Sequence, residues 1–540
     1  MFKQTPGTRQ GRRRSRMSYR RCSVWLLMVL LLASGCVKVG PDFAKPDAEV
    51  MPKWLEAGEY RQLTAKTEDY RDWWQAFNDP VLNNLIQTAY KQNLPLRIAG
   101  VRVLGARAQL GVAVGSLYPQ SQQAQAAVQK FRFSQTTPLT APGSTLIFWG
   151  SSIGVTASWE IDFWGKFRRA VESADASLLA SVADYDNALV SLCGDVANSY
   201  ISIRTLEKRL NIARQNVEVQ KKSLQIAQAR FQGGTTSKRD VEQATTVLES
   251  TEATIPSLEA QLRQTQNALC ILLGMPPRDI GDLLGVKSEI PAPPPEVAVG
   301  IPADLLRRRP DVQAAELRAA AQCAQIGVAK ANLFPAFSLS GNFGLQAGDA
   351  SPFALANMFD WKSRAGTIGP AVQWNLFNYG QITNQVRFQD VRFQELLIAY
   401  QNAVLQAQQE VENALIGFLK SQQRAQKLVE ATAAAQRSVD LAILQYREGI
   451  TDFTTVLTAE QTLLTQQDNL AVTLGDISAN LVGVYRAMGG GWQIRDGKDF
   501  VPDSIKEAMA RRTNWGKLLT PVSLPPPRDE PRYDIKAPMW

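Results

Sequence analysis

Two stretches of this chain alternate apolar and polar residues with the period of a β-strand. Between residues 152 and 163 one face carries Ile153, Val155, Ala157, Trp159, Ile161 and Phe163, and the other carries Ser152, Thr156, Ser158, Glu160 and Asp162. Such a period of two predicts a strand of about ten residues whose two sides meet unlike surroundings. The pattern returns 215 residues later around 369–381, where Ile368, Val372, Trp374 and Leu376 oppose Gln373 and Asn375, and a strand is predicted over Ile368–Phe377.

A further strand is predicted before each of these two. Gln123–Phe133 comes before the first, and Phe337–Leu345 comes before the second. The connection after Phe133 is rich in Thr, Pro, Gly and Ser, as exposed loops are. The pattern therefore predicts four strands in two β-hairpins.

Each hairpin leads directly into a very long helical stretch. From Phe167 to Gln232 apolar residues recur at sevens as Val171, Leu178, Tyr185 and Leu192 and then, after a shift of four, as Val196, Ile203, Leu210, Val217, Leu224 and Phe231. This spacing indicates a coiled-coil seam with a stutter that locally unwinds the supercoil. Ile382–Arg447 has the same character, with Leu397, Val404, Val411 and Phe418 at sevens. At 1.5 Å per residue each helix is roughly 100 Å long, too long for one globular core.

Shorter helices reverse the chain after each long one. Gly233–Thr236 is predicted as a turn, Asp240–Leu273 as a return helix, and Ala303–Leu333 as a second short helix. In the second half Gly449–Thr451 turns the chain into a helix that ends near Met488. Landmarks of the two halves keep one offset of 215 residues: Pro95 and Pro310, Trp159 and Trp374, Val196 and Val411, Gly274 and Gly489. The chain is therefore predicted to be an internal duplication.

Composition excludes several classes of function. The 540 residues contain no histidine, which rules out a His-dependent triad, a His general base and His-ligated metals. Residues 1–35 hold eight of the 59 Lys and Arg residues and no acid, so the other 51 basic residues balance the 50 acidic ones. The net charge of +9 therefore does not indicate a nucleic-acid partner. No catalytic constellation or metal site stands out, and an enzyme is not expected.

The first 35 residues are predicted to be a signal peptide. Basic residues precede the apolar run Val24–Leu32, which is too short to span a bilayer, and small residues lead to Cys36. Leu32–Cys36 is similar to a lipobox, so Cys36 is predicted to carry diacylglycerol and an N-acyl chain, with no other cofactor; an ordinary cleaved signal is the alternative. Val37 favours sorting to the outer membrane. The other cysteines of the mature chain are expected to be small buried hydrophobes: Cys193, Cys270 and Cys323.

Four strands with one apolar face cannot close a membrane barrel, since single-chain barrels begin at about eight strands and an open edge in lipid leaves backbone groups unsatisfied. The chain is therefore expected to supply one sector of an oligomeric barrel, and three copies would supply twelve strands. The alternatives are a sheet packed on a protein core and helices that form a solvent-exposed rod. In a barrel, these aromatic residues are interpreted as a girdle at the membrane boundary: Trp159, Phe163, Trp164, Trp374, Phe377 and Tyr379.

Short motifs are spread over residues 36–492, and Arg308–Asp311 is the most specific of them. They are Cys36 with Gly40-Pro41-Asp42, Trp73-Trp74 with Phe77 and Asp79-Pro80, Ile301–Leu306 with Arg308-Arg309-Pro310-Asp311, Trp374–Phe377 with Gly380, Tyr446–Gly449, and Gly489–Trp492. Together they resemble the TolC family of bacterial outer-membrane efflux channels, in the OprM-like, NodT-type lipoprotein branch that serves resistance-nodulation-division (RND) pumps.

The resemblance implies a homotrimer with a β-barrel in the outer membrane and a helical tunnel in the periplasm. Such a protein is a passive exit duct that docks to a periplasmic membrane-fusion adaptor and an inner-membrane RND pump. The hairpin tips that would meet the adaptor are Gly233, Gly234, Thr235, Thr236, Ser237, Glu448, Gly449, Ile450 and Thr451. The periplasmic aperture would lie at Asp452, Thr454, Thr458 and Glu460. Relatives often carry a bulky Leu and an Asp ring where Thr454 and Thr458 stand here; Asp452 and Glu460 are nearby acids that could substitute, or could lie on an exposed face.

The sequence thus predicts a mixed α and β membrane protein, internally duplicated, that contributes four strands to a trimeric 12-stranded β-barrel and long helices to a coiled-coil barrel. Its divisions are a signal peptide (1–35), a lipidated N-terminal arm (36–72), repeat 1 (73–285), a Pro-rich linker (286–300), repeat 2 (301–492) and a C-terminal tail without assignment (493–540). The predicted function is the outer-membrane channel of a tripartite RND-type efflux system, lipid-anchored in the bacterial outer membrane. An envelope-spanning structural or adaptor lipoprotein with coiled-coil hairpins is the alternative.

Overall fold

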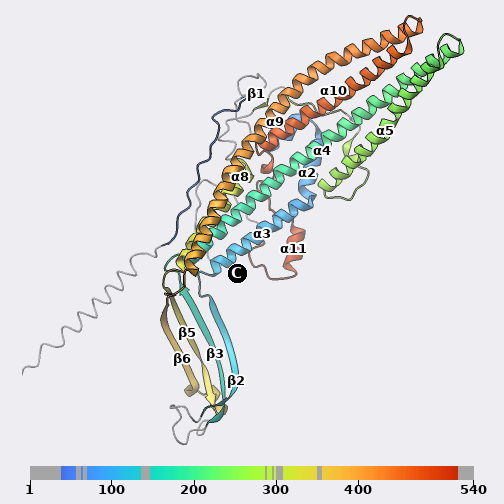
Figure 1. Ribbon diagram of the computed structural model, residues 1–540. Helices are drawn as coiled ribbons and strands as arrows, with labels where there is room; N and C mark the ends of the chain where they lie inside the picture. The colour runs from blue at the N-terminus through green and yellow to red at the C-terminus, as the bar shows by residue number, and fades with distance from the viewer. Residues whose placement is uncertain are drawn as a thin grey trace, which may run out of the picture.

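The computed structural model describes residues 38–55, 63–64, 70–134, 146–285, 289–294, 297–298, 308–349 and 355–520. The molecule is elongated, with a β-sheet at one end, two helical hairpins reaching the opposite end, and shorter helices packed around the middle (Figure 1). The predicted signal peptide and lipid-attachment residue Cys36 lie outside the described residues, as do residues 301–307 of the Arg-Arg-Pro-Asp motif region.

Two long helices run the length of the helical part. α4 (Lys166–Gln232) and α9 (Gln381–Arg447) are uninterrupted helices of 67 residues each, as the heptad spacing predicts. α5 (Lys238–Leu272) returns along α4, and α10 (Phe453–Ala487) returns along α9 (Figure 1). The turns between them contain Gly234 and Gly449 with φ of +73° and +76°, a left-handed conformation that favours glycine at the end of a helix.

Most of the predicted heptad seam is buried. The buried members are Leu178, Tyr185, Leu192, Val196, Ile203, Leu210 and Val217 in α4, and Val404, Val411 and Phe418 in α9. Phe231 differs, because α4 ends there and 43% of its side chain is exposed.

Shorter helices cover the half of α4 nearest the sheet. α8 (Pro310–Ala331) packs on both α4 and α9, and α3 (Leu94–Gly115) lies along α4 (Figure 1). Among the described residues α3 is the one helix with the length and hydropathy to cross a membrane, but its contacts place it in the helical part. The predicted helix from Ala303 is described only from Pro310 onward; Arg309 is extended because the α conformation is disfavoured before proline.

The sheet has the strand order β2–β3–β5–β6 and is antiparallel throughout. Its strands are β2 (Ser121–Arg132), β3 (Ile147–Ile161), β5 (Ala336–Gly348) and β6 (Arg364–Gln373). Pairing of β3 with β5 joins the two repeats in one sheet. The fourth strand was predicted to reach Phe377 but ends at Gln373, which pairs with the first residue of β5, so later residues have no partner strand.

The smaller elements connect these parts. β1 (Leu63–Thr64) pairs in parallel with β4 (Val297–Ala298), which joins the N-terminal arm to the linker. α2 (Pro80–Gln92) is capped by Asp79, which accepts hydrogen bonds from the backbone of Val81 and Leu82. The remaining elements are η1 (Tyr70–Phe77), α6 (Gly281–Leu284), η2 (Leu355–Phe359), η3 (Trp361–Ser363), η4 (Trp492–Arg495) and α11 (Asp503–Ala510).

Motif residues far apart in the sequence meet in the middle of the molecule. Trp73 stacks on Tyr485 with ring centroids 5.3 Å apart. A Cβ on Gly490 would lie 2.9 Å from Tyr70, so only glycine fits against that helix. Arg309 is buried and donates a hydrogen bond of 2.7 Å to the carbonyl of Ala487. These motifs therefore hold the end of α10 against the start of each repeat.

The C-terminal segment as far as residue 520 belongs to this helical body. Arg495 and Asp186 form a buried ion pair with an Nη2–Oδ2 distance of 2.7 Å. Burial raises the pKa of Asp186 to about 6, while the hydrogen bonds from Arg495 act in the opposite direction. Phe500 and Val501 are also buried beyond η4. The part of the tail that the structure describes is thus packed, although its sequence suggested no assignment.

Candidate functional site

In the half of the sheet nearest the helices one face is apolar and the other is polar, as the alternation predicts. Paired residues share a face, and the register brings these residues together on the apolar side: Val155, Ala157, Trp159 and Ile161 with Phe337, Leu339, Gly341 and Phe343 and with Ile368, Pro370 and Val372. The opposite side has Thr156, Ser158 and Glu160 with Ser338, Ser340 and Asn342. Ile368 is 81% exposed and Val372 is 63% exposed. An apolar face of this extent without a protein cover is typical of a surface that meets lipid or a partner.

Both outer strands of the sheet have an open edge. β2 pairs only with β3 and β6 only with β5 within the described chain. In a membrane the backbone groups along these edges would be unsatisfied, because lipid offers no hydrogen-bonding partner. The sheet is therefore built to be continued by further strands.

Aromatic residues gather where the sheet meets the long helices. Trp164 stacks on Phe334 with ring centroids 4.6 Å apart, and Phe163 lies 5.2 Å from Phe337. The indole nitrogen of Trp164 donates to the carbonyl of Pro335 at 2.8 Å. Two other residues predicted for the girdle, Phe377 and Tyr379, are almost fully exposed after β6.

The duplicated sequence makes equivalent contacts in both repeats at this junction. The indole nitrogen of Trp159 donates to Leu117 at 3.1 Å, and that of Trp374 donates to Leu333 at 3.0 Å. Each long helix then starts at a left-handed glycine, Gly165 or Gly380. All six predicted girdle residues thus lie at the end of the sheet next to the long helices, at a similar position along the long axis of the molecule.

The two hairpin tips form the opposite end (Figure 1). Gly233, Gly234, Thr235 and Ser237 are exposed in the first tip, as are Glu448, Gly449 and Ile450 in the second; Thr236 and Thr451 are half-buried. Arg230 ties the tips together, since its guanidinium lies 4.7 Å from the ring centroid of Tyr446 and donates to the carbonyls of Tyr446 and Arg447 at the end of α9. A cation at a helix C-terminus also interacts favourably with the helix dipole.

A row of polar residues on α4 faces the second hairpin. The contacts are Arg209 with Asp468 at 2.7 Å, Asn216 with Gln467 at 2.7 Å, Ser223 with Glu460, and Arg230 with the end of α9. These α4 residues recur every seven positions, one residue before the apolar seam, so they share one side of the helix. The sequence reasoning missed this row, although its heptad spacing was a usable signal.

The predicted aperture residues separate into two groups. Thr454 and Thr458 are exposed on α10, and Asp452 is exposed and caps that helix by accepting from the backbone of Thr455. Glu460 is only 3% exposed and accepts a hydrogen bond from Ser223 of α4. Burial raises the pKa of Glu460, and the Ser223 hydrogen bond opposes that shift. The interpretation of Glu460 as an acid lining the aperture is therefore wrong, because its side chain faces the neighbouring helix.

The three cysteines of the described chain are buried and unpaired, as expected: Cys193, Cys270 and Cys323. The sheet, the junction and the tips together define a subunit of a membrane channel with a long helical extension.

Comparison with known proteins makes the identification specific. The family described as outer membrane efflux protein matches residues 85–275 and 301–490, one match in each half, and the chain belongs to this family. Nodulation protein T of Rhizobium leguminosarum bv. trifolii is 30% identical and aligns over 86% of this chain and 96% of its own length. Pyoverdine export outer membrane protein OpmQ of Pseudomonas putida is 32% identical over 78% of this chain and 88% of its own. The solved structure of the outer-membrane channel OprN has a TM-score of 0.78 and 32% identity, covering 84% of this chain and 99% of that one.

The predicted kinship with TolC-family channels is therefore confirmed, and so are the duplicated fold, the efflux function and the outer-membrane location. The exact boundaries of the predicted divisions stay a prediction. The two family matches fall inside the predicted repeats.

Proposed function

We propose that three copies of this chain form the exit duct of a tripartite efflux system. The observation that supports this most is the four-stranded sheet with two unlike faces and two open edges. Three such sheets joined edge to edge would bring twelve strands, which exceeds the roughly eight strands at which single-chain barrels begin, and would leave no edge in lipid. The apolar face would meet lipid and the polar face would line the water-filled lumen.

The helical hairpins would form the periplasmic tunnel of this duct. Their exposed tips, 233–237 and 448–451, are the proposed contact with a periplasmic membrane-fusion adaptor, which would connect the duct to an inner-membrane RND pump. Relatives named as outer membrane proteins of efflux pumps, such as TtgC of Pseudomonas putida, favour such partners. Asp452, Thr454 and Thr458 remain the proposed residues around the aperture. Conduction would be passive and would need no catalytic group or cofactor.

Two features would attach the duct to the outer membrane. The first is the girdle, formed by the six aromatic residues at the junction. The second is a diacylglycerol and an N-acyl chain on Cys36, supported by the position of Lys38, which lies beside the junction. Cys36→Ser should abolish labelling by radioactive palmitate, and persistent labelling would refute this attachment site.

The assembly can be tested on purified protein. Size-exclusion chromatography with light scattering should give a trimer of the 59.5 kDa chain, less its signal peptide. Planar bilayers should show conductance, directly or after substitutions in the tips. A detergent-soluble monomer that conducts under no condition would contradict the proposal.

A further inference from the structure

A buried charged cluster lies in the first turns of α4, next to the junction with the sheet. Arg169 is 1% exposed and Glu172 is 6% exposed, and Arg169 Nη1 donates to both carboxylate oxygens of Glu172 at 2.9 and 3.0 Å. Charged side chains are almost never buried this deeply unless other groups satisfy them. The channel fold as such does not explain why this position needs a buried arginine.

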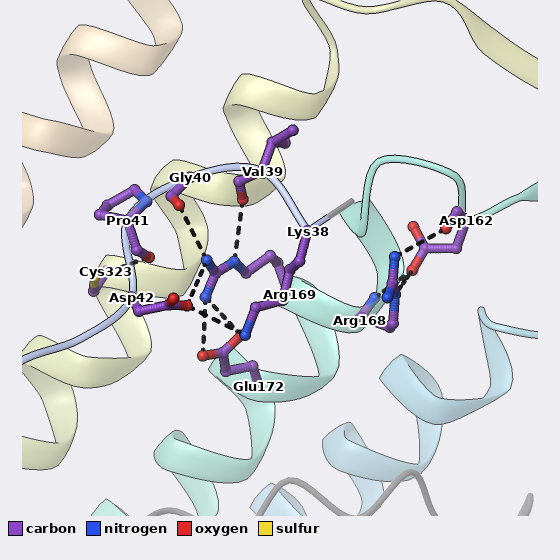
Figure 2. Close-up of polar contacts among 10 residues, drawn as sticks. All are labelled: Lys38, Val39, Gly40, Pro41, Asp42, Asp162, Arg168, Arg169, Glu172 and Cys323. Carbon is purple, nitrogen blue, oxygen red and sulfur yellow. Dashed lines mark hydrogen bonds and ion pairs between the residues drawn. The ribbon is translucent and has the colours of Figure 1, made fainter. Parts of the chain in front are cut away.

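Among the described residues, the other hydrogen-bond and ion-pair partners of the Arg169 and Glu172 side chains belong to one short segment, Lys38–Asp42 (Figure 2). Arg169 donates through Nε to the carbonyl of Val39 at 3.1 Å and through Nη2 to the carbonyl of Gly40 at 3.2 Å. The same guanidinium lies 2.9 Å from the carboxylate of Asp42, and Lys38 Nζ lies 3.2 Å from that of Glu172. The hydrogen bond from Arg169 holds the pKa of Asp42 below its usual value. Side chains and backbone of the segment are thus both recognised.

The lack of a Cβ at three glycines lets Lys38–Asp42 pack closely against the helices. A Cβ on Gly327 of α8 would lie 2.8 Å from both the Arg169 side chain and the carbonyl of Val39. Gly40 has φ of +97°, and a Cβ there would lie 2.5 Å from Gly327. At Gly165, just before α4, a Cβ would lie 3.0 Å from the Cα of Lys38. The site therefore fits a backbone in close contact, and it lies between a helix of repeat 1 and a helix of repeat 2.

The position of Lys38–Asp42 limits how far Cys36 can lie from the junction. The backbone of Val39 donates to the carbonyl of Trp164 at 3.0 Å, beside the junction aromatics. Cys36 precedes Lys38 by two residues, so a fully extended chain places it no more than about 7 Å further away. Acyl chains on Cys36 would then enter the membrane at the level of the girdle.

We propose that Arg169, Glu172 and Gly327 form a seat for the processed N-terminus, which binds Lys38–Asp42 and holds the acylated Cys36 at the junction between sheet and tunnel helices. The seat positions the lipid and takes no part in its attachment. This proposal rests on the lipid attachment proposed above. It adds that the protein body, and not a loose tether, determines where the acyl chains enter the bilayer.

The test uses the full-length protein in outer-membrane fragments with the periplasmic face accessible. Cells are labelled with radioactive palmitate, treated with limited trypsin, and the labelled peptides that are released are identified by mass. Cleavage after Lys38 releases the acylated peptide 36–38, whereas cleavage after Lys53 releases a longer labelled peptide. Arg169→Met should be labelled like the wild type but should release the labelled peptide 36–38 about tenfold faster or more, because losing even one charge-assisted hydrogen bond to the segment shifts the open population by that factor. Asp42→Ala, which alters the segment and not the body, should show a smaller increase in the same direction.

Arg168→Met is the matched control. Figure 2 shows Arg168 turned away from the segment toward Asp162, with an Nε–Oδ2 distance of 3.1 Å. This variant should keep the wild-type cleavage rate, and all variants should keep the same heat-resistant oligomer. Equal rates for Arg169→Met, Asp42→Ala and the wild type would overturn the seat, as would an equal acceleration in Arg168→Met. Loss of palmitate from Arg169→Met would show that this residue acts in processing instead. If the wild type takes up no palmitate, the lipid attachment fails, while the rates of cleavage after Lys38, followed by peptide mass, still decide whether the seat binds the segment.

Discussion

The assignment of the apolar face of the sheet to lipid predicts a strong asymmetry between two arginine substitutions. Ile368 is the fifth of the ten residues of β6, it lies on the apolar face, and it is 81% exposed. An arginine on the lipid face of a barrel costs about 2–4 kcal/mol near the bilayer midplane. Ile368→Arg should therefore lower the folding equilibrium constant of each chain by about 30- to 900-fold, and the penalty applies to every copy in an oligomer.

Ser340→Arg is the matched control for this change. Ser340 neighbours Gly341, the residue of β5 that pairs with Ile368, so it has the same depth but lies on the polar face. An arginine there should cost little if that face lines a water-filled lumen. Both variants can be folded into lipid vesicles and titrated with urea, with heat-modifiable gel mobility as the readout of the folded barrel. Equal loss in the two variants, or a greater loss in Ser340→Arg, would refute the assignment of the faces.

Other contacts give further predictions. Arg495→Met leaves Asp186 buried without its partner, which should lower the free energy of unfolding by about 3–5 kcal/mol in guanidinium titrations. Combining it with Asp186→Leu should restore most of that free energy. A double variant as unstable as Arg495→Met would contradict the buried pair. Glu460 is disfavoured as a carboxylate in the folded state because burial raises its pKa above 4.5. Stability of the wild type relative to Glu460→Gln should therefore rise as the pH falls through that raised pKa toward 4.5, and thermal melts at a series of pH values would disprove this if the difference stayed constant. Gly234→Ala should cost about 1 kcal/mol because its φ is +73°, whereas Gly233→Ala, with φ of −76°, should be neutral in the same melting experiment; equal effects would argue against the left-handed turn.

The helices and strands could be predicted because each produces a local periodicity. The heptads of α4 and the alternation in β3 reflect side-chain directions that the backbone repeats every few residues. Gly234 and Gly449 similarly mark turns whose backbone conformation favours glycine. The constant offset of 215 residues revealed the duplication without any coordinates.

Contacts between distant residues could not be predicted in the same way. The lengths of α4 and α9, the two faces of the sheet and the similarity to efflux channels could be read from the sequence alone, since these depend on local patterns and short motifs. The contact of Glu460 with Ser223 and the end of β6 at Gln373 emerge only in the folded chain, because each depends on the register between separate elements. The same holds for the binding of Arg169 to the backbone of Val39 and Gly40, about 130 residues earlier in the sequence. A buried arginine and an exposed one look alike in a sequence, and what distinguishes them is the chain that folding brings against them.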